Sequence, residues 1–128
     1  MASVKPIPEG YHTVTPYLFI KGAANAIEFY KNVFGAQEVV RMPGPNGRIM
    51  HAELKIGDSL IMISHGDGLR EPVSAFLYVY VENVDMTYQR AVEAGAETLE
   101  LPSDQVYGDR RAMVKDQWGN LWQIASRL

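Results

Sequence analysis

The sequence contains no cysteine, and this absence removes several kinds of chemistry at once. Disulfides, thiol nucleophiles and Cys-based zinc sites are all excluded. The chain also lacks an apolar run near the roughly 18 residues that a membrane-spanning helix requires. We therefore expect a cytoplasmic protein that has no membrane partner and that depends on side-chain packing for its stability.

Positive charge is also scarce, with 12 Lys and Arg residues against 15 Asp and Glu and a net charge of −3. The basic residues are scattered, and the only adjacent pair is Arg110-Arg111. Nucleic-acid binding needs a concentrated basic face, so we expect no nucleic-acid partner. The composition, 47% hydrophobic and 21% charged, is ordinary for a globular protein.

The chain reads as two copies of one unit, each with the order strand, helix, strand, strand, strand. The first copy is predicted at 14–20, 23–34, 37–42, 48–56 and 60–64, and the second at 76–81, 84–94, 97–101, 110–115 and 121–126. Gly35 and Gly95 are expected to end the two helices in a left-handed conformation. The chain of 128 residues is then one domain, residues 1–128, with modules at about 11–65 and 74–127 and a polar, glycine-rich linker at 66–73.

Several segments resemble a known family. Thr15-Pro16-Tyr17-Leu18, Ala26 to Tyr30 and Phe34-Gly35-Ala36 resemble the opening of vicinal oxygen chelate (VOC) proteins, the glyoxalase/bleomycin resistance protein/dioxygenase superfamily. Tyr107-Gly108-Asp109-Arg110 and Asp116 to Trp122 resemble the ending of its PhnB-like branch, except that Gln117 stands where the branch usually has proline. The resemblance implies an α+β fold in which two βαβββ modules form an incomplete barrel, and it implies a frequent homodimer.

Enzymes of the superfamily commonly hold a divalent metal in the cup of the barrel, with two ligands from each module. Carried over to this chain, those four positions fall on Thr15, Ile61, Phe76 and Gln123. Such side chains cannot form a hard-cation site of histidine and carboxylate ligands. We therefore expect no metal and no other cofactor, with a divalent metal as the alternative.

His51 and Glu53 are the candidate catalytic pair, because residues two apart on a strand share one side. On that side His51 is able to act as a general base whose tautomer the carboxylate sets. The alternative is that the strand merely has a polar, solvated or dimer-facing side.

Aromatic and basic side chains suggest a ligand-binding cup. Alternation places Phe76, Tyr78 and Tyr80 on one side of a strand, and a guanidinium nearby favours an anionic or carbonyl-bearing ligand. The predicted ligand-binding residues are Tyr17, Phe19, Phe76, Tyr78, Tyr80, Arg111 and Gln123. The alternative is that the rings fill the barrel or a dimer seam. Alternation also allows only one of Arg110 and Arg111 to face the cup.

Three functions fit these residues. The first is a glyoxalase/bleomycin-resistance-like homodimer that binds a small organic ligand without a metal. The second is a VOC-type lyase, isomerase or dioxygenase-like enzyme, dependent on a metal or on His51 as general base. The third is a structural or regulatory dimer with an unused cup. Membership of a fold cannot choose among them.

Overall fold

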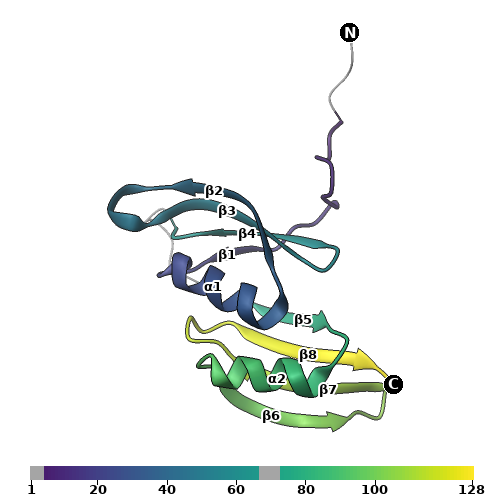
Figure 1. The fold of residues 1–128 in the computed structure, drawn as a ribbon. Coiled ribbons are helices and arrows are strands. Elements are labelled where there is room, and N and C mark those ends of the chain that lie inside the picture. The colour runs from purple at the N-terminus through teal and green to yellow at the C-terminus, as the bar shows by residue number, and fades with distance from the viewer. Residues whose placement is uncertain (1–4, 67–72) are drawn as a thin grey trace.

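The computed structural model describes residues 5–66 and 73–128. In chain order (Figure 1) the elements are β1 (Tyr17–Phe19), α1 (Ala23–Phe34), β2 (Gln37–Pro43), the short 3₁₀ helix η1 (Pro45–Gly47), β3 (Ile49–Ile56), β4 (Ser59–Ser64), β5 (Phe76–Tyr80), α2 (Val84–Glu93), β6 (Glu97–Asp104), β7 (Asp109–Lys115) and β8 (Leu121–Arg127). Apart from η1, each half has the predicted order of strand, helix and three strands. The predicted linker lies mostly outside the described residues.

Each module forms its own four-stranded sheet. The strand orders are β1-β4-β3-β2 and β5-β8-β7-β6, so the two sheets have the same topology. The first and last strands of each module are parallel, and the other pairs are antiparallel. The sheets are not closed into one barrel. This is the predicted α+β fold of two βαβββ modules in an incomplete barrel.

The two helices end near the predicted glycines, with one difference. α1 ends at Phe34, and Gly35 caps it in the left-handed conformation with φ of 67°. α2 ends at Glu93 and is capped by Ala94, so that Gly95, with φ of 107°, follows the cap. A Cβ atom on Gly95 would overlap the side chain of Gln117, so this position requires glycine for space as well as for φ.

Two strands differ in length from the prediction. The first strand was expected at 14–20 but covers only Tyr17–Phe19, and it begins directly after Pro16, which has no N–H to donate. β6 is longer than expected, because Ser103 and Asp104 continue to pair with β7 in the segment predicted as a loop.

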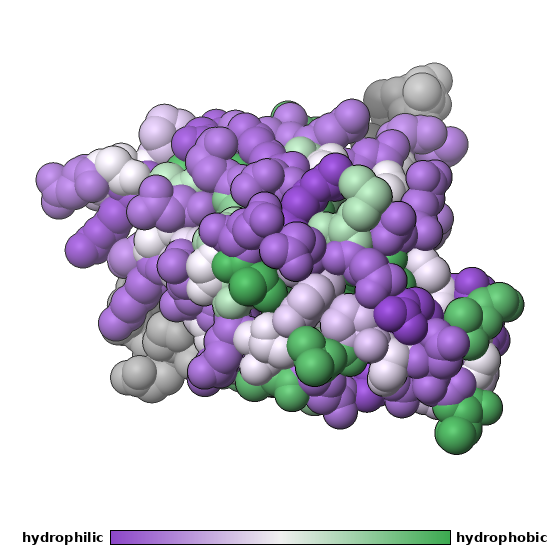
Figure 2. Space-filling view, turned by 60° about the horizontal axis from the view of Figure 1, so that its bottom comes forward, coloured by the Kyte–Doolittle hydropathy of each residue, from purple (hydrophilic) through white to green (hydrophobic). Residues whose placement is uncertain are grey.

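A single core joins the modules, because α1 packs against both its own sheet and α2. Figure 1 shows α1 between the strands of the first module and the elements of the second. No helix in the described ranges is long and apolar enough to span a membrane. In the view of Figure 2 the surface is mainly hydrophilic, with separate hydrophobic groups near its middle and lower right.

The buried carboxylate of Asp116 connects the two modules. Its Oδ2 accepts hydrogen bonds from the Tyr30 hydroxyl on α1 at 2.6 Å and from Nε1 of Trp122 on β8 at 2.9 Å. Its Oδ1 accepts the backbone N–H groups of Trp118 and Asn120 at 3.0 and 2.9 Å. Burial, followed by the nearby carboxylate, raises the pKa of Tyr30 far above its usual value, so its hydroxyl remains a donor. The carboxylate thus anchors a helix of the first module to the last turn of the second.

Replacing Asp116 should destabilise the fold strongly. Asp116→Ala removes the acceptor for four donors, and we expect a loss of about 3 kcal/mol of unfolding free energy. Tyr30→Phe removes the hydrogen bond to Asp116 and a longer one, 3.4 Å, from the Asn120 amide, and should cost about 1 kcal/mol. Urea unfolding followed by circular dichroism measures both, with the exposed Asp58→Ala as a near-neutral control. If Asp116→Ala were no more destabilising than Tyr30→Phe, the central role of the carboxylate would be wrong.

Candidate functional site

Each sheet has one face that its own helix does not cover, which we call the open face. On the first sheet, strand pairing places the side chains of Tyr17, His51, Glu53 and Met62 on this face. On the second sheet the same reasoning gives Phe76, Tyr78, Tyr80, Arg111 and Gln123. The structure therefore divides the predicted site residues into two groups, one on each module.

The open face of the first module carries a chain of hydrogen bonds. The Tyr17 hydroxyl lies 3.2 Å from Nδ1 of His51, and Nε2 of His51 lies 2.9 Å from Oε2 of Glu53. The other oxygen of Glu53 accepts the hydroxyl of Tyr11, a residue that precedes β1. Both ring nitrogens and both carboxylate oxygens are thus engaged. The side chains of His51 and Glu53 are 22% and 19% exposed.

These contacts favour the ionised form of Glu53. Hydrogen bonds from Tyr11 and then from His51 hold the pKa of the Glu53 carboxyl below its usual range. Burial, followed by the bond to Glu53, raises the pKa of Tyr11 to about 12. At neutral pH the group therefore consists of a phenol that donates and a carboxylate that accepts.

The open face of the second module is organised around Asp109. Its carboxylate is almost fully buried and accepts the hydroxyls of Tyr78 at 2.6 Å and Tyr80 at 3.0 Å. Arg127 of β8 donates to the other carboxylate oxygen at 3.0 Å. The hydrogen bond from Tyr78, followed by that from Tyr80 and the charge of Arg127, lowers the pKa of Asp109. Asp109 thus fixes the orientation of the two tyrosines.

Arg111 and Arg110 point to opposite faces, as strand alternation predicts. Arg111 lies on the open face and donates to Oε1 of Gln123 at 2.8 Å and to Glu100 at 2.6 Å. Its Nε is buried and has no hydrogen-bond partner among the residues that the structure describes. Arg110 lies on the other face, where it forms a two-point ion pair with Asp85 of α2.

The four positions expected for metal ligands do not form a donor set. Thr15 offers a single hydroxyl before β1, and the Phe76 ring offers no lone pair. Ile61 does not even face the open side, because it pairs with Leu54 and both side chains are buried in the core. Met62 instead occupies the position equivalent to Gln123. Within 5–66 and 73–128, no three His, Asp or Glu side chains gather as a cluster able to hold a metal ion. These side chains do not fit a divalent metal.

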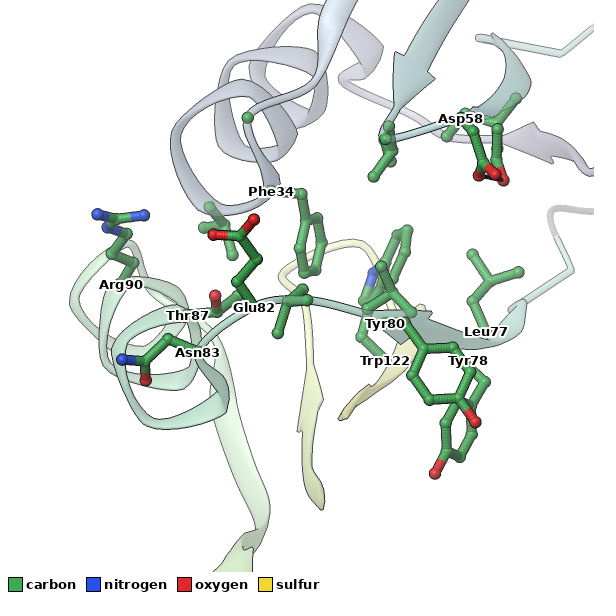
Figure 3. A pocket seen from close by; sticks show the side chains of 18 of the residues that line it. Phe34, Asp58, Leu77, Tyr78, Tyr80, Glu82, Asn83, Thr87, Arg90 and Trp122 are labelled. Atoms are coloured by element: carbon green, nitrogen blue, oxygen red, sulfur yellow. Dashed lines mark hydrogen bonds between the residues drawn. The ribbon is translucent and has the colours of Figure 1, made fainter. Parts of the chain in front are cut away.

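A cavity of about 780 Å³ lies between the modules, away from most of the predicted site residues. Figure 3 shows Phe34 and Asp58 of the first module across from Leu77, Trp122 and the beginning of α2. Tyr78 and Tyr80 border it through β5, but their hydroxyl ends point to the side of the strand away from Phe34. The described residues that line the cavity form no hydrogen-bonded set of titratable groups comparable to those on the open faces. We therefore place the candidate site on the open faces.

Sequence reasoning missed four contributors to the site: Tyr11, Glu100, Tyr107 and Arg127. Each acts through a long-range contact; the Tyr107 hydroxyl, for example, lies 3.2 Å from that of Tyr78 and 3.3 Å from the Arg111 guanidinium. No local pattern marks these residues, although the position of Tyr107 inside the Tyr-Gly-Asp-Arg motif was a signal.

Comparison with known proteins agrees with the architecture. The model of the Glyoxalase/Bleomycin resistance protein/Dioxygenase superfamily matches residues 11–124. An uncharacterized protein from Mycobacterium bovis is 34% identical over 122 residues, covering 87% of this chain and 80% of the relative.

Solved structures show the same fold. TioX from Micromonospora sp. ML1 superposes with a TM-score of 0.74 at 24% identity, covering 91% of this chain and 97% of the other. A glyoxalase/bleomycin resistance protein/dioxygenase family enzyme from Burkholderia phytofirmans superposes with a TM-score of 0.72 at 22% identity, covering 88% and 95%.

The architecture defines a class of α+β proteins with two βαβββ modules in one chain. Within that class, the chain belongs to the Glyoxalase/Bleomycin resistance protein/Dioxygenase superfamily.

Stability should depend on pH through Glu53. Because its folded pKa is lowered, its ionic contribution is present above the ordinary glutamate pKa of about 4.3 and is lost as the pH falls through the folded pKa. The difference in unfolding free energy between wild type and Glu53→Gln should therefore be largest near neutral pH and shrink below about pH 4. Urea unfolding at several pH values measures it, with the exposed Glu9→Gln as control. A difference that is independent of pH would contradict this account of Glu53.

Proposed function

We propose that this protein is a homodimer of the PhnB-like branch that binds a small organic ligand on its open faces without a divalent metal. The observation that carries the proposal is the buried Nε–H of Arg111, which has no hydrogen-bond partner within residues 5–66 and 73–128. A buried donor without a partner costs free energy, and an oxygen of a ligand that reaches it when the covering side chains shift would remove that cost. Because the donor belongs to a guanidinium, the ligand is expected to carry a carboxylate or carbonyl group.

The aromatic side chains supply the apolar part of the site. Phe76 and Tyr80 are each 60% exposed, and Tyr17 is 44% exposed. Rings held at such exposure on a sheet face favour contact with a planar organic group. Asp109 fixes the orientation of Tyr78 and Tyr80, so the surface is organised before a ligand arrives. An aromatic or conjugated carboxylate fits both features.

The metal-free form of the proposal rests on donor chemistry. A divalent ion requires several oxygen or nitrogen ligands around one point, and Phe76, Met62 and Thr15 do not provide them. The PhnB-like assignment rests on two motifs, Tyr107-Gly108-Asp109-Arg110 and Asp116 to Trp122. Both motifs contribute to the structure, because Asp109 binds the hydroxyls of Tyr78 and Tyr80 and Asp116 binds the hydroxyl of Tyr30 on α1.

Ligand binding should depend on Arg111. We expect aromatic carboxylates such as benzoate and phenylpyruvate to raise the melting temperature of the protein more than the neutral benzyl alcohol. Arg111→Gln should abolish this preference, because it removes the guanidinium that is proposed to bind the carboxylate. Arg110→Gln is the matched control, since Arg110 lies on the opposite face and should leave the preference intact.

The same thermal-shift measurement tests the metal. After dialysis against a chelator the stabilisation by benzoate is expected to be unchanged, and its disappearance would show that a metal takes part. The ligand proposal itself fails if no aromatic carboxylate stabilises the protein, or if Arg111→Gln and Arg110→Gln behave alike.

The exposed rings also predict self-association. Monomers rarely leave many large apolar side chains open to solvent, and a second copy packed against the open faces would cover these rings and enclose the bound ligand between the two copies. Sedimentation equilibrium should give about twice the chain mass of 14.3 kDa. Phe76→Asp should shift the equilibrium toward the monomer, whereas Val39→Asp, at an exposed position on β2, serves as a matched control. A wild-type protein that stays monomeric at high concentration would overturn the dimer.

A further inference from the structure

The hydrogen-bond chain on the first module ends at Tyr17, and this determines which group a ligand meets. His51 uses Nδ1 for Tyr17 and Nε2 for Glu53, so neither ring nitrogen is free for a ligand. Tyr17 is 44% exposed, which makes it the most accessible of the residues in this chain of hydrogen bonds. A ligand on this face would therefore contact the Tyr17 hydroxyl, and His51 would affect the ligand only through its hydrogen bond to Tyr17.

The direction of each hydrogen bond follows from the donors available. Glu53 is held ionised and can only accept, so with neutral His51 the proton must be on Nε2. Nδ1 is then an acceptor, and the Tyr17 hydroxyl donates to it. The Tyr17 oxygen keeps its lone pairs for a ligand. Tyr11, which donates to the second oxygen of Glu53, holds the carboxylate in place.

We propose that Tyr17, His51 and Glu53 form a proton-accepting site that binds a weakly acidic hydroxyl compound as its anion. The ligand O–H bond breaks and its proton passes to the Tyr17 oxygen, while the proton of Tyr17 passes to Nδ1 of His51. The electron pair of the broken bond stays on the ligand oxygen, which then accepts a hydrogen bond from Tyr17. The imidazolium formed lies between Tyr17 and Glu53, the total charge is unchanged, and no oxidant or reductant is required.

The chemistry of the surroundings selects the ligand class. Carboxylic acids are already ionised near neutral pH, and aliphatic alcohols are too weakly acidic for an imidazole to take their proton. Phenols and enols with electron-withdrawing groups have acidities between those of carboxylic acids and aliphatic alcohols. The Phe19 ring, 5.2 Å from that of Tyr17, and the side chains of Leu60 and Met62 on the same face offer apolar contacts to such a ring.

The second module lacks an equivalent acceptor. Tyr78 occupies the position of Tyr17, and Arg111, which precedes Ala112, occupies the position of His51, which precedes Ala52. A guanidinium donates hydrogen bonds but does not take up a proton. The proton-accepting role therefore belongs to the first module, and the second supplies a fixed positive charge. The inference rests on the proposed ligand binding and adds to it the kind of hydroxyl group that the first module takes and the ionisation state of that group.

The experiment uses 4-nitrophenol, whose anion absorbs visible light and whose neutral form does not. At a pH where the free probe is mostly neutral, adding the protein should increase the anion absorbance. Tyr17→Phe and His51→Gln should both abolish the increase, because one removes the hydroxyl and the other removes the base. Tyr88→Phe on α2 and His65→Gln are matched controls that should keep it. 4-Nitroanisole, which has no acidic hydroxyl, measures binding without proton transfer by thermal shift.

The outcomes separate the inference from the proposed function. If 4-nitrophenol stabilises the protein but remains neutral, or fails to bind while aromatic carboxylates bind, the inference is wrong and ligand binding stands. Persistence of the anion signal in both Tyr17→Phe and His51→Gln, with circular dichroism showing folded variants, would also overturn it. If neither the nitro compounds nor the carboxylates raise the melting temperature, the proposed function fails and the inference fails with it.

Discussion

The arrangement of the molecule depends on one buried carboxylate, that of Asp116. It accepts the hydroxyl of Tyr30 from the first module and, within the second, the indole N–H of Trp122 and two backbone N–H groups. Since a buried carboxylate needs donors and buried donors need acceptors, the set is stable only when both modules are in place. Around it pack the rings of Phe34 and Trp122, 4.6 Å apart. The position of α1 between the modules, and with it the seam that contains the cavity, follows from this contact.

The two open faces show how one unit can acquire two chemistries. In equivalent places on the central strands, the first module has His51 beside a carboxylate and the second has Arg111 beside an amide, that of Gln123. In the function proposed above, one face takes up a proton and the other holds a negative charge. Each module also secures its tyrosines with a carboxylate, Glu53 holding Tyr11 in the first and Asp109 holding two in the second. The shared sheet allows this because strands pair through their backbones, so the side chains that alternation places on the open face can differ between the modules.

The two-module fold could be predicted because its signals are local: helical spacing before Gly35, alternation in β3, and turns at Gly57 and Gly119. Which residues of β4 lie on the open face could not be predicted. Its central residues run Leu60-Ile61-Met62-Ile63, apolar on both sides, so alternation gives no direction, and Ile61 was placed one residue away from the position equivalent to Gln123. For Arg110 and Arg111, by contrast, alternation alone left two possibilities, since only one of them can lie on the open face. The pairing of Arg111 with Ala125 shows that it is Arg111.

What the sequence by itself determined is the repeated order of elements, the family and which residues share one face of a strand, since these follow from neighbours a few residues apart. Only the tertiary structure decided which side chains meet. Tyr11 and Glu53 are 42 residues apart, Asp109 and Arg127 are 18 apart, and Tyr30 and Asp116 are 86 apart. Such pairs leave no periodic trace, because each forms only after the strands have taken their register and the modules have packed together. The hydrogen bonds that engage both ring nitrogens of His51 and leave Tyr17 more exposed than His51 are of this second kind.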